Sequence, residues 1–407
     1  MKISLQEKRR FKLAFCYDKF LLAAEKVYIH TLRVLTTLLT ASIWLIVISC
    51  VIFGNQIAKH GTKLSIIVSI IFLLILYICF QGLLVWLCIL CRRLRIGKRL
   101  LVWMVMWVPV VNFGVALYVR GLAKKEIDHT LYKINLDDIR AELQICSTRY
   151  PLLLVHGVGF RDFHYFNYWG RIPRELTRNG AKVYYGHQEA WGTVEDNAQI
   201  LKDKIYEIKR ETGCEKVNII AHSKGGLDSR YLISGLHMEE QIASLTTINT
   251  PHQGSALVEF LKRLPDWLYK LVCSYIDLYF GKLGDKNADS YTASYQLSKA
   301  FAKEFNEKYP NASGVFYQSY ASLMKCGFSS KLLCIPYWIL KKLDAPNDGL
   351  VTVDSAKWGE FRGVMTSSHM RGISHGDVID LTREDYEGFD VKEFYVGLVK
   401  ELKAKGF

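Results

Sequence analysis

Ser223 is the residue of this chain best suited to act as a nucleophile. It lies within Lys216–Gly226, after a β-prone run with four apolar residues and before two glycines. This pattern predicts a buried strand, a tight turn with the serine at its tip, and a helix. The strand and helix of such a turn pack closely, so small residues are needed two positions either side of the serine, where Ala221 and Gly225 lie. An ordinary serine in a strand–helix loop would give a similar pattern. Whether Ser223 is a nucleophile therefore depends on the presence of a base and an acid elsewhere in the chain.

Two later turns could supply those partners. A serine hydroxyl attacks only when a base takes its proton, and an acid must hold that base in one tautomer. Asp348 lies in an Asn-Asp-Gly turn that would aim its carboxylate at a strand end, although it could also be a plain turn aspartate. The base is His375 or else His369, and we prefer His375 because its loop directly precedes the closing helix. His252 precedes the acid, which is the wrong order for this arrangement.

Backbone N–H groups are needed to stabilise the negative charge that develops on the attacked carbonyl oxygen. One donor is expected at Lys224, directly after the nucleophile. The other is expected at Val158, in the loop after an apolar strand at 152–155. A His-Gly dipeptide in this loop, followed later by a serine turn, is a specific combination. We expect His156 to stabilise the loop and His222 to be structural, rather than to take part in the chemistry.

The elements between residues 150 and 250 alternate between strand and helix. The strands are expected at 152–155, 182–185, before Ser223 and at 242–248, and the helices at 169–179 and 193–212. This alternation predicts a mainly parallel sheet covered by helices. Aromatic, helical sequence at 255–311 interrupts it, and we interpret this insertion as a lid that is apolar where it meets lipid or covers the site. Ordinary core helices are the alternative. A strand at 314–320 and an amphipathic helix at 389–403 complete the unit.

The net charge of +14 comes almost entirely from the first 121 residues, which hold 16 Lys/Arg and 3 Asp/Glu, whereas residues 122–407 hold 37 and 36. These basic residues flank long apolar runs, as at a membrane and unlike a nucleic-acid groove, so no nucleic-acid partner is expected. Runs at 34–54 and 64–91 are long enough to span a bilayer, and the run at 100–119 either spans it or turns back. We expect a membrane anchor with two or three transmembrane helices, followed by a connector at 122–149.

The orientation follows from the distribution of basic residues. The N-terminus and the loop at 92–99 are rich in Lys and Arg, so the positive-inside rule places both in the cytoplasm. Three spans would then leave the catalytic domain at 150–407 on the extracellular side, which is the placement we expect. A re-entrant third run would leave it in the cytoplasm.

Residues 150–400 resemble the bacterial triacylglycerol lipases of the α/β-hydrolase superfamily. The matching motifs keep the order and spacing of that family, and they are Pro151-Leu-Leu-Leu-Val-His-Gly157, Tyr168-Trp169 with Ile172-Pro173 and Leu176, Lys216–Gly226, Asn249-Thr-Pro-His-Gln-Gly-Ser255, Asn347-Asp-Gly-Leu-Val351 and His375-Gly-Asp-Val. The resemblance implies an α/β-hydrolase fold with a lid within 255–311. It also implies these roles: nucleophile Ser223, acid Asp348, base His375, and oxyanion donors Val158 and Lys224. The first 121 residues lie outside it.

The resemblance also bears on metal binding. Lipases of this family often carry a structural calcium near the catalytic histidine, and Asp377 matches one ligand of that ion. The second aspartate that the resemblance implies, upstream of the catalytic acid, has no match in residues 325–331. We therefore expect that no cofactor is required.

Together these patterns predict a membrane-anchored serine ester hydrolase that cleaves acyl esters, with acyl lipids of the bilayer as its substrates. A phospholipase, a thioesterase or an acyltransferase would use the same triad, and the sequence does not separate them. The alternative from another class is a non-catalytic membrane interaction protein built on a hydrolase scaffold. The complete order of Ser223, Asp348 and His375 argues against a decayed site.

Overall fold

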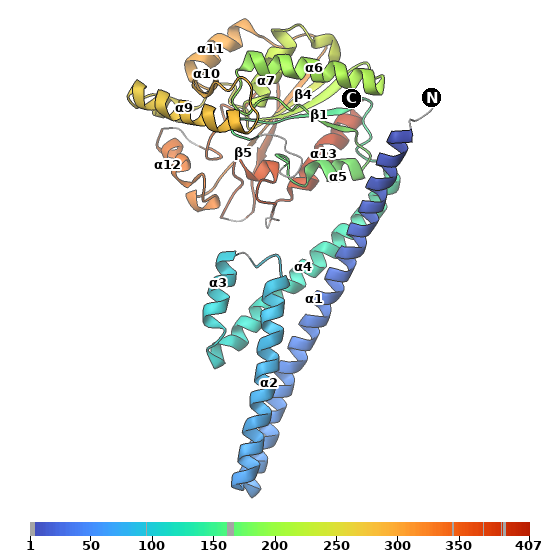
Figure 1. The fold of residues 1–407 in the computed structure, drawn as a ribbon, viewed down its shortest axis with the longest axis vertical. Helices are drawn as coiled ribbons and strands as arrows, with labels where there is room; N and C mark the ends of the chain where they lie inside the picture. The colour runs from blue at the N-terminus through green and yellow to red at the C-terminus, as the bar shows by residue number, and fades with distance from the viewer. Residues whose placement is uncertain are drawn as a thin grey trace. The chain divides into compact units, whose positions relative to one another are not determined.

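The computed structural model describes residues 5–407, apart from residues 95, 161–166, 344–345, 369, 384, 386 and 387. Side chains are described from residue 23 onward, apart from those residues and residues 60, 109, 110, 137, 138, 141 and 343. The chain forms two compact units, Met1–Ile139 and Arg140–Phe407 (Figure 1).

The first unit is helical and begins with α1 (Leu5–His60) and α2 (Lys63–Leu90). Thr62 starts α2, because its hydroxyl accepts a hydrogen bond from the Ser65 N–H at 3.2 Å. Segments Ala23–Lys59 and Lys63–Leu90 are long and apolar enough to cross a membrane, although a signal sequence near an N-terminus has the same character. Only 11% and 17% of their most apolar windows are buried within the protein, so neither is the core helix of a globular domain.

The third apolar run, expected at 100–119, is divided between two helices. The first of them, α3 (Ile96–Val105), ends before Pro109, where α4 (Pro109–Leu143) begins. Proline has no backbone N–H and is tolerated at the first position of a helix but not in its interior. Among the helices that the structure describes, only α1 and α2 contain an apolar segment of spanning length.

The second unit is built on a six-stranded parallel sheet with the order β2-β1-β3-β4-β5-β6. The strands are β1 (Leu152–Val155), β2 (Val183–Tyr185), β3 (Val217–His222), β4 (Ile242–Ile248), β5 (Phe316–Ser322) and β6 (Glu360–Met365). The order reverses at β1, because β2 and β3 lie on opposite sides of it. In open parallel sheets such a reversal opens a crevice at the carboxyl ends of the strands, here between β1 and β3.

Helices cover both faces of this sheet, as Figure 1 shows. Alternate residues of β1 divide between two cores: Leu152 and Leu154 pack with α5 (Ile172–Arg178) and α13 (Val391–Ala404). Their neighbours Leu153 and Val155 pack with α6 (Val194–Thr212) and α7 (Gly225–Ser234). Because both faces are covered, every residue of β1, β3 and β4 is buried. The α/β-hydrolase fold class expected from the sequence is confirmed.

Between β4 and β5 the chain forms four helices, α8 (Ala256–Leu261), α9 (Asp266–Lys282), α10 (Ser290–Tyr295) and α11 (Lys299–Lys308). These helices fill the region in which the sequence predicted a lid insertion. A further helix, α12 (Cys334–Leu343), lies between β5 and β6. No pattern in the sequence predicted α12, which is short and is preceded by Leu333 rather than by a Ser, Thr, Asp or Asn cap.

Candidate active site

Ser223 occupies a strained turn between β3 and α7. Its φ is +54°, in the left-handed region that residues with a side chain rarely adopt. A Cβ at Gly225 would lie 2.3 Å from the His156 carbonyl oxygen, and one at Gly226 would lie 2.2 Å from Thr250 Oγ1. Both glycines are therefore required by close packing of the turn. This strain and packing distinguish the turn from an ordinary strand–helix loop.

Asp348 and His375 are joined by a buried hydrogen bond. The distance from His375 Nδ1 to Asp348 Oδ2 is 2.7 Å, and the backbone N–H of His375 donates to the Asp348 carbonyl at 2.9 Å. The other carboxylate oxygen of Asp348 accepts from the N–H groups of Leu350 and Val351 at 2.9 and 2.8 Å. An ionised carboxylate can only accept, so we assign the proton to Nδ1 of His375. The Nε2 atom is then free to act as a base.

The pair lies beside the serine turn. The ring of His222, the residue preceding Ser223, is 4.5 Å from the ring of His375 between centroids. Within the part of the chain that the structure describes, no hydrogen bond links Ser223 Oγ to His375. Contacts between nucleophile and base are often longer in a free enzyme and shorten when substrate binds.

His222 has the character of a structural residue. It is fully buried, and its Nδ1 lies 2.7 Å from the hydroxyl of Tyr168. Burial and then the neighbouring charge of His375 hold the pKa of His222 well below its ordinary value. His222 is therefore neutral beside the pair of Asp348 and His375. The same Tyr168 hydroxyl accepts the Gly157 N–H at 3.1 Å, which links the loop after β1 to the serine turn.

Two backbone N–H groups near Ser223 are available to a substrate. A Cβ at Gly157 would lie 2.7 Å from the Cβ of Ser223, so the loop after β1 closely approaches the serine. The N–H groups of Val158 and Lys224 donate no hydrogen bond among the described residues. These are the donors that the sequence predicted for an oxyanion.

Lys224 also carries a buried ion pair that sequence reasoning missed. Its Nζ lies 2.6 Å from Asp228 Oδ1, and the two side chains are 2% and 1% exposed. The other oxygen of Asp228 accepts from Asn197 Nδ2 at 3.1 Å. Burial raises the pKa of Asp228, and the positive charge of Lys224 opposes that shift. The four-residue spacing of Lys and Asp at the start of a helix was the available signal.

The remaining histidines have other roles. His156 is held at both ring nitrogens by carbonyl oxygens, that of Gly157 at 2.8 Å and that of Gln188 at 3.0 Å. This is the loop-stabilising arrangement expected from the sequence. His252 is buried against Trp358, with ring centroids 5.2 Å apart, and it contacts Thr247 Oγ1 at 3.0 Å. His369, the alternative base, lies outside the described residues.

The loop that contains His375 does not fit a calcium ion. One oxygen of Asp377 binds Arg371 at 3.1 Å, and the other accepts the Ser374 N–H at 2.9 Å. Asp380 in the same loop is held by Arg171 at 2.8 Å. Across the described residues, no group of three or more His, Cys, Asp or Glu side chains could hold a metal ion.

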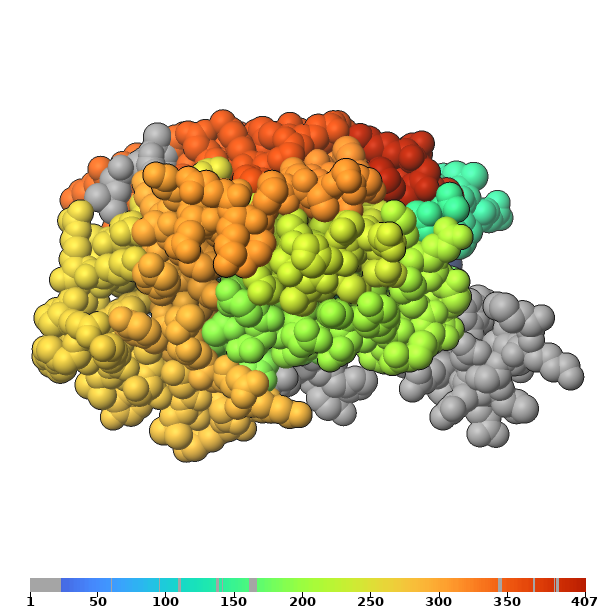
Figure 2. Space-filling model, turned by 90° about the horizontal axis from the view of Figure 1, so that it is seen from above, coloured from blue at the N-terminus to red at the C-terminus, as the bar shows by residue number. Residues whose placement is uncertain are grey.

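The insertion between β4 and β5 exposes many large apolar side chains. On α9 they include Trp267 and Tyr275, each 68% exposed, and Leu278, which is 59% exposed. In Figure 2 the yellow atoms of this insertion gather at one side of the second unit. On α12 the exposed fractions of Ile335 and Trp338 are 74% and 45%. Surfaces of this kind mark contacts with a membrane, a protein or an apolar ligand.

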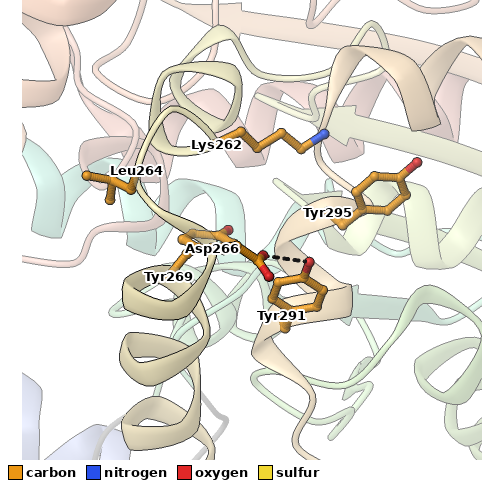
Figure 3. Close-up of a pocket in the computed structure, with 6 residues that line it drawn as sticks. All are labelled: Lys262, Leu264, Asp266, Tyr269, Tyr291 and Tyr295. Atoms are coloured by element: carbon orange, nitrogen blue, oxygen red, sulfur yellow. Dashed lines mark hydrogen bonds between the residues drawn. The ribbon is translucent and has the colours of Figure 1, made fainter.

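A pocket of about 90 Å³ lies within the insertion, where the turn before α9 meets α10 (Figure 3). Tyr291 donates to Asp266 at 3.4 Å, and the ammonium of Lys262 lies 4.5 Å from the ring centroid of Tyr295. The pocket is lined by none of the catalytic candidates.

No family model matches the chain. The chain is 33% identical to triacylglycerol lipase 2 of Saccharomyces cerevisiae over 263 residues, covering 59% of this chain and 74% of the yeast protein. It is 35% identical to a triacylglycerol lipase of Pseudarthrobacter phenanthrenivorans over 180 residues, covering 41% and 56%. It is 26% identical to a triacylglycerol lipase of Pseudomonas fragi over 307 residues, covering 64% and 98%.

Two solved structures are also similar. The mature lipase BlEst2 of Bacillus licheniformis has a TM-score of 0.47 and 23% identity, covering 61% of this chain and 91% of that chain. The metagenomic carboxyl esterase MGS0156 has a TM-score of 0.49 and 17% identity, covering 64% and 77%.

Proposed function

This chain belongs to the triacylglycerol lipase family, whose members are carboxylic ester hydrolases, and on that premise we propose that it is a membrane-anchored serine hydrolase with the triad Ser223, His375 and Asp348. The observation that carries the proposal is the 2.7 Å contact between His375 and Asp348, beside a serine in a strained turn. The positive φ of that serine and the buried acid–histidine pair are costly features that a scaffold without chemistry would not need.

In the proposed reaction Ser223 Oγ attacks the acyl carbonyl carbon while His375 Nε2 takes its proton. Asp348 stabilises the imidazolium that forms, through the bond to Nδ1. The negative oxygen of the tetrahedral intermediate accepts hydrogen bonds from the N–H groups of Val158 and Lys224. His375 then gives the proton to the leaving alcohol, and an acyl-enzyme remains. Water activated by the same histidine releases the fatty acid and restores Ser223.

We propose acyl lipids of a membrane as the substrates. Support comes from the two apolar segments Ala23–Lys59 and Lys63–Leu90, and from the exposed apolar side chains of α9 and α12. Burying apolar surface in a bilayer gives about 25 cal/mol for each Å², so these side chains favour contact with lipid. In this proposal both apolar segments span the membrane, and the insertion with α9 acts as a lid.

The side of the membrane that the catalytic domain faces depends on the number of spans. The basic N-terminus favours the cytoplasm, and two spans return the chain to the side on which it started. The extracellular placement expected from three spans needs the run at 100–119 to cross as well, and that run is divided at Pro109. We therefore propose two spans and a catalytic domain on the cytoplasmic side.

The triad is tested by hydrolysis of p-nitrophenyl butyrate with the full chain in detergent. Ser223→Ala should lower kcat by roughly 10⁴-fold or more, because the acyl-enzyme cannot form. His375→Ala should cause a comparable loss, whereas His369→Ala, the matched histidine control, should retain activity. Circular dichroism should show an unchanged fold in all three variants. Full activity in Ser223→Ala would refute the mechanism, and loss confined to His369→Ala would move the base to that residue.

The substrate class is tested by incubating the wild-type chain with vesicles of mixed membrane lipids and measuring the products by mass spectrometry. Release of fatty acids in wild type, and not in Ser223→Ala, is the expected result. The lipids that disappear would identify the headgroup and separate triacylglycerol lipase from phospholipase activity. Hydrolysis of soluble esters with no change in any vesicle lipid would contradict the proposed substrate while leaving the triad intact.

A further inference from the structure

Arg371 lies four residues before His375 and joins two segments that frame the base. Its Nη2 donates to Asp377 Oδ1 at 3.1 Å, and its Nε donates to the carbonyl oxygen of Ser329 at 2.9 Å. The side chain of Asp377 is 3% exposed and that of Arg371 is 24% exposed, so the carboxylate is buried and the guanidinium is partly buried. A guanidinium with donors on two sides can hold a carboxylate and a carbonyl at once.

The backbone of Arg371 is fixed to the same neighbouring segment. Its carbonyl oxygen accepts the Lys325 N–H at 3.2 Å and also the hydroxyl of Ser329. Two residues later, the Ile373 N–H donates to the Leu323 carbonyl at 2.7 Å. The segment at 323–329 therefore runs along the start of the loop that carries the base.

The same segment contacts the loop that carries the acid. The Met324 N–H donates to the Asn347 carbonyl at 3.0 Å, directly before Asp348. Segment 323–329 thus touches the loops of both the acid and the base. Asp377 completes the arrangement, because its second oxygen accepts the Ser374 N–H at 2.9 Å, next to His375. A displacement of Arg371 would change the angle at which His375 meets Asp348.

We propose that Arg371 is a positioning residue that holds the His375 loop by a guanidinium bridge between Asp377 and Ser329, where related lipases would use a metal ion. The bridge supplies one positive charge to a carboxylate and a carbonyl oxygen, which are the hard oxygen ligands that calcium prefers. With Asp377 held by Arg371 and Asp380 held by Arg171, neither of these two carboxylates is free to bind an ion. The proposal rests on the proposed role of His375 as the base.

The proposal predicts a specific kinetic signature. In this proposal Arg371 acts through the His375 loop and not on the substrate, so its loss should leave the KM for p-nitrophenyl butyrate unchanged. Misplacing a catalytic group by about 1 Å can cost about 10²-fold in rate, so kcat of Arg371→Ala should fall by roughly 10- to 100-fold. Arg371→Lys keeps the charge but cannot donate from two planar positions, so its kcat should be intermediate. Added guanidinium ion at low millimolar concentration should partly restore kcat of Arg371→Ala only.

The matched control is Arg362→Ala. Arg362 is also an arginine bound to carboxylates, those of Glu360 at 2.6 Å and Glu401 at 2.7 Å, but it lies on the surface in β6. Its replacement should leave both kcat and KM unchanged. If Arg371→Ala does not fold by circular dichroism, Arg371→Lys and Asp377→Asn decide the question by the same kcat measurement.

Metal independence is tested on the wild-type chain by two readouts. Dialysis against EDTA should leave kcat and the unfolding temperature unchanged, and isothermal titration with calcium chloride should give no binding heat at micromolar protein. Calcium binding, or loss of kcat that calcium restores, would overturn the proposal. So would unchanged kcat in Arg371→Ala while His375→Ala is inactive. Full activity in His375→Ala would instead refute the proposed triad, so the two failures are distinguishable.

Discussion

Replacing either partner of the buried ion pair of Lys224 and Asp228 should strongly destabilise the second unit, Arg140–Phe407. Replacing both residues together should not. In Lys224→Met the carboxylate of Asp228 would remain in the core without its cation. In Asp228→Asn the ammonium of Lys224 would lose its anion but keep its long side chain. The amide oxygen introduced by that substitution would still accept the hydrogen bond that Asn197 now donates to Asp228 at 3.1 Å.

The size of the expected loss in stability follows from the burial of both side chains. Removing one partner of a buried ion pair costs about 3–5 kcal/mol, because the remaining charge has no compensation. For a domain of 150–250 residues each kcal/mol shifts the unfolding temperature by roughly 2–4 °C, so each single variant should lose about 6–20 °C. The double variant leaves no charge at these two positions and should lie within about 1–2 kcal/mol of wild type.

The loss of folding stability in Lys224→Met should also depend on pH. Burial already raises the pKa of Asp228 above its ordinary value of 3.8, and Lys224 opposes that shift. Without Lys224 the pKa rises further, so the native state binds this proton more tightly than the unfolded chain does. The stability of the variant is then retained below pH 3.8 and lost as pH rises through the raised pKa. The difference in stability from wild type should therefore increase as the pH rises above 3.8.

The assay is thermal unfolding of the full chain in detergent, followed by near-ultraviolet circular dichroism at pH 5 and pH 8. Arg362→Ala is a suitable control, because its ion pairs are at the surface and surface pairs contribute about 0–1 kcal/mol. Single variants that lose less than about 2 °C would show that the pair is solvated in the native state. A double variant that loses the sum of both single effects would refute the charge argument and indicate a packing role instead.

Two further predictions concern the loop after β1, which carries Val158, and the membrane orientation. Gly157→Ala should fold but lower kcat by at least about 10²-fold, because its Cβ would lie 2.7 Å from the Cβ of Ser223 and displace this loop. An unchanged kcat would exclude the loop from the site. Lys357 is exposed, so Lys357→Cys in a cysteine-free background reports on the side of the membrane that the domain faces. This cysteine should be protected from a membrane-impermeant reagent in intact cells and should react after lysis. Reaction in intact cells would require a third crossing and place the domain outside.

Much of the site follows from local sequence. The strand before Ser223, the small residues around it and the helix after it are set by hydrophobic periodicity and by the steric limits of one turn. The same is true of α6, which begins at the Thr193 cap and ends at Gly213 with a φ of +69°. The acid and histidine motifs also predicted that Asp348 and His375 would be partners, and the two side chains are in direct contact. These features depend on residues close together in sequence, so the chain alone carries the signal.

Tertiary structure decided the contacts that support those side chains. Arg371 and Ser329 are separated by 42 residues, and Arg171 and Asp380 by 209, yet each pair is in direct contact. No spacing rule connects such positions, because loops at the carboxyl ends of parallel strands meet according to strand order and register. The sequence offered Asp377 as a calcium ligand, and only the folded chain assigned Arg371 as its partner. The residue types proposed for catalysis are therefore set by local sequence, whereas the groups that hold them in place depend on which loops the sheet brings together.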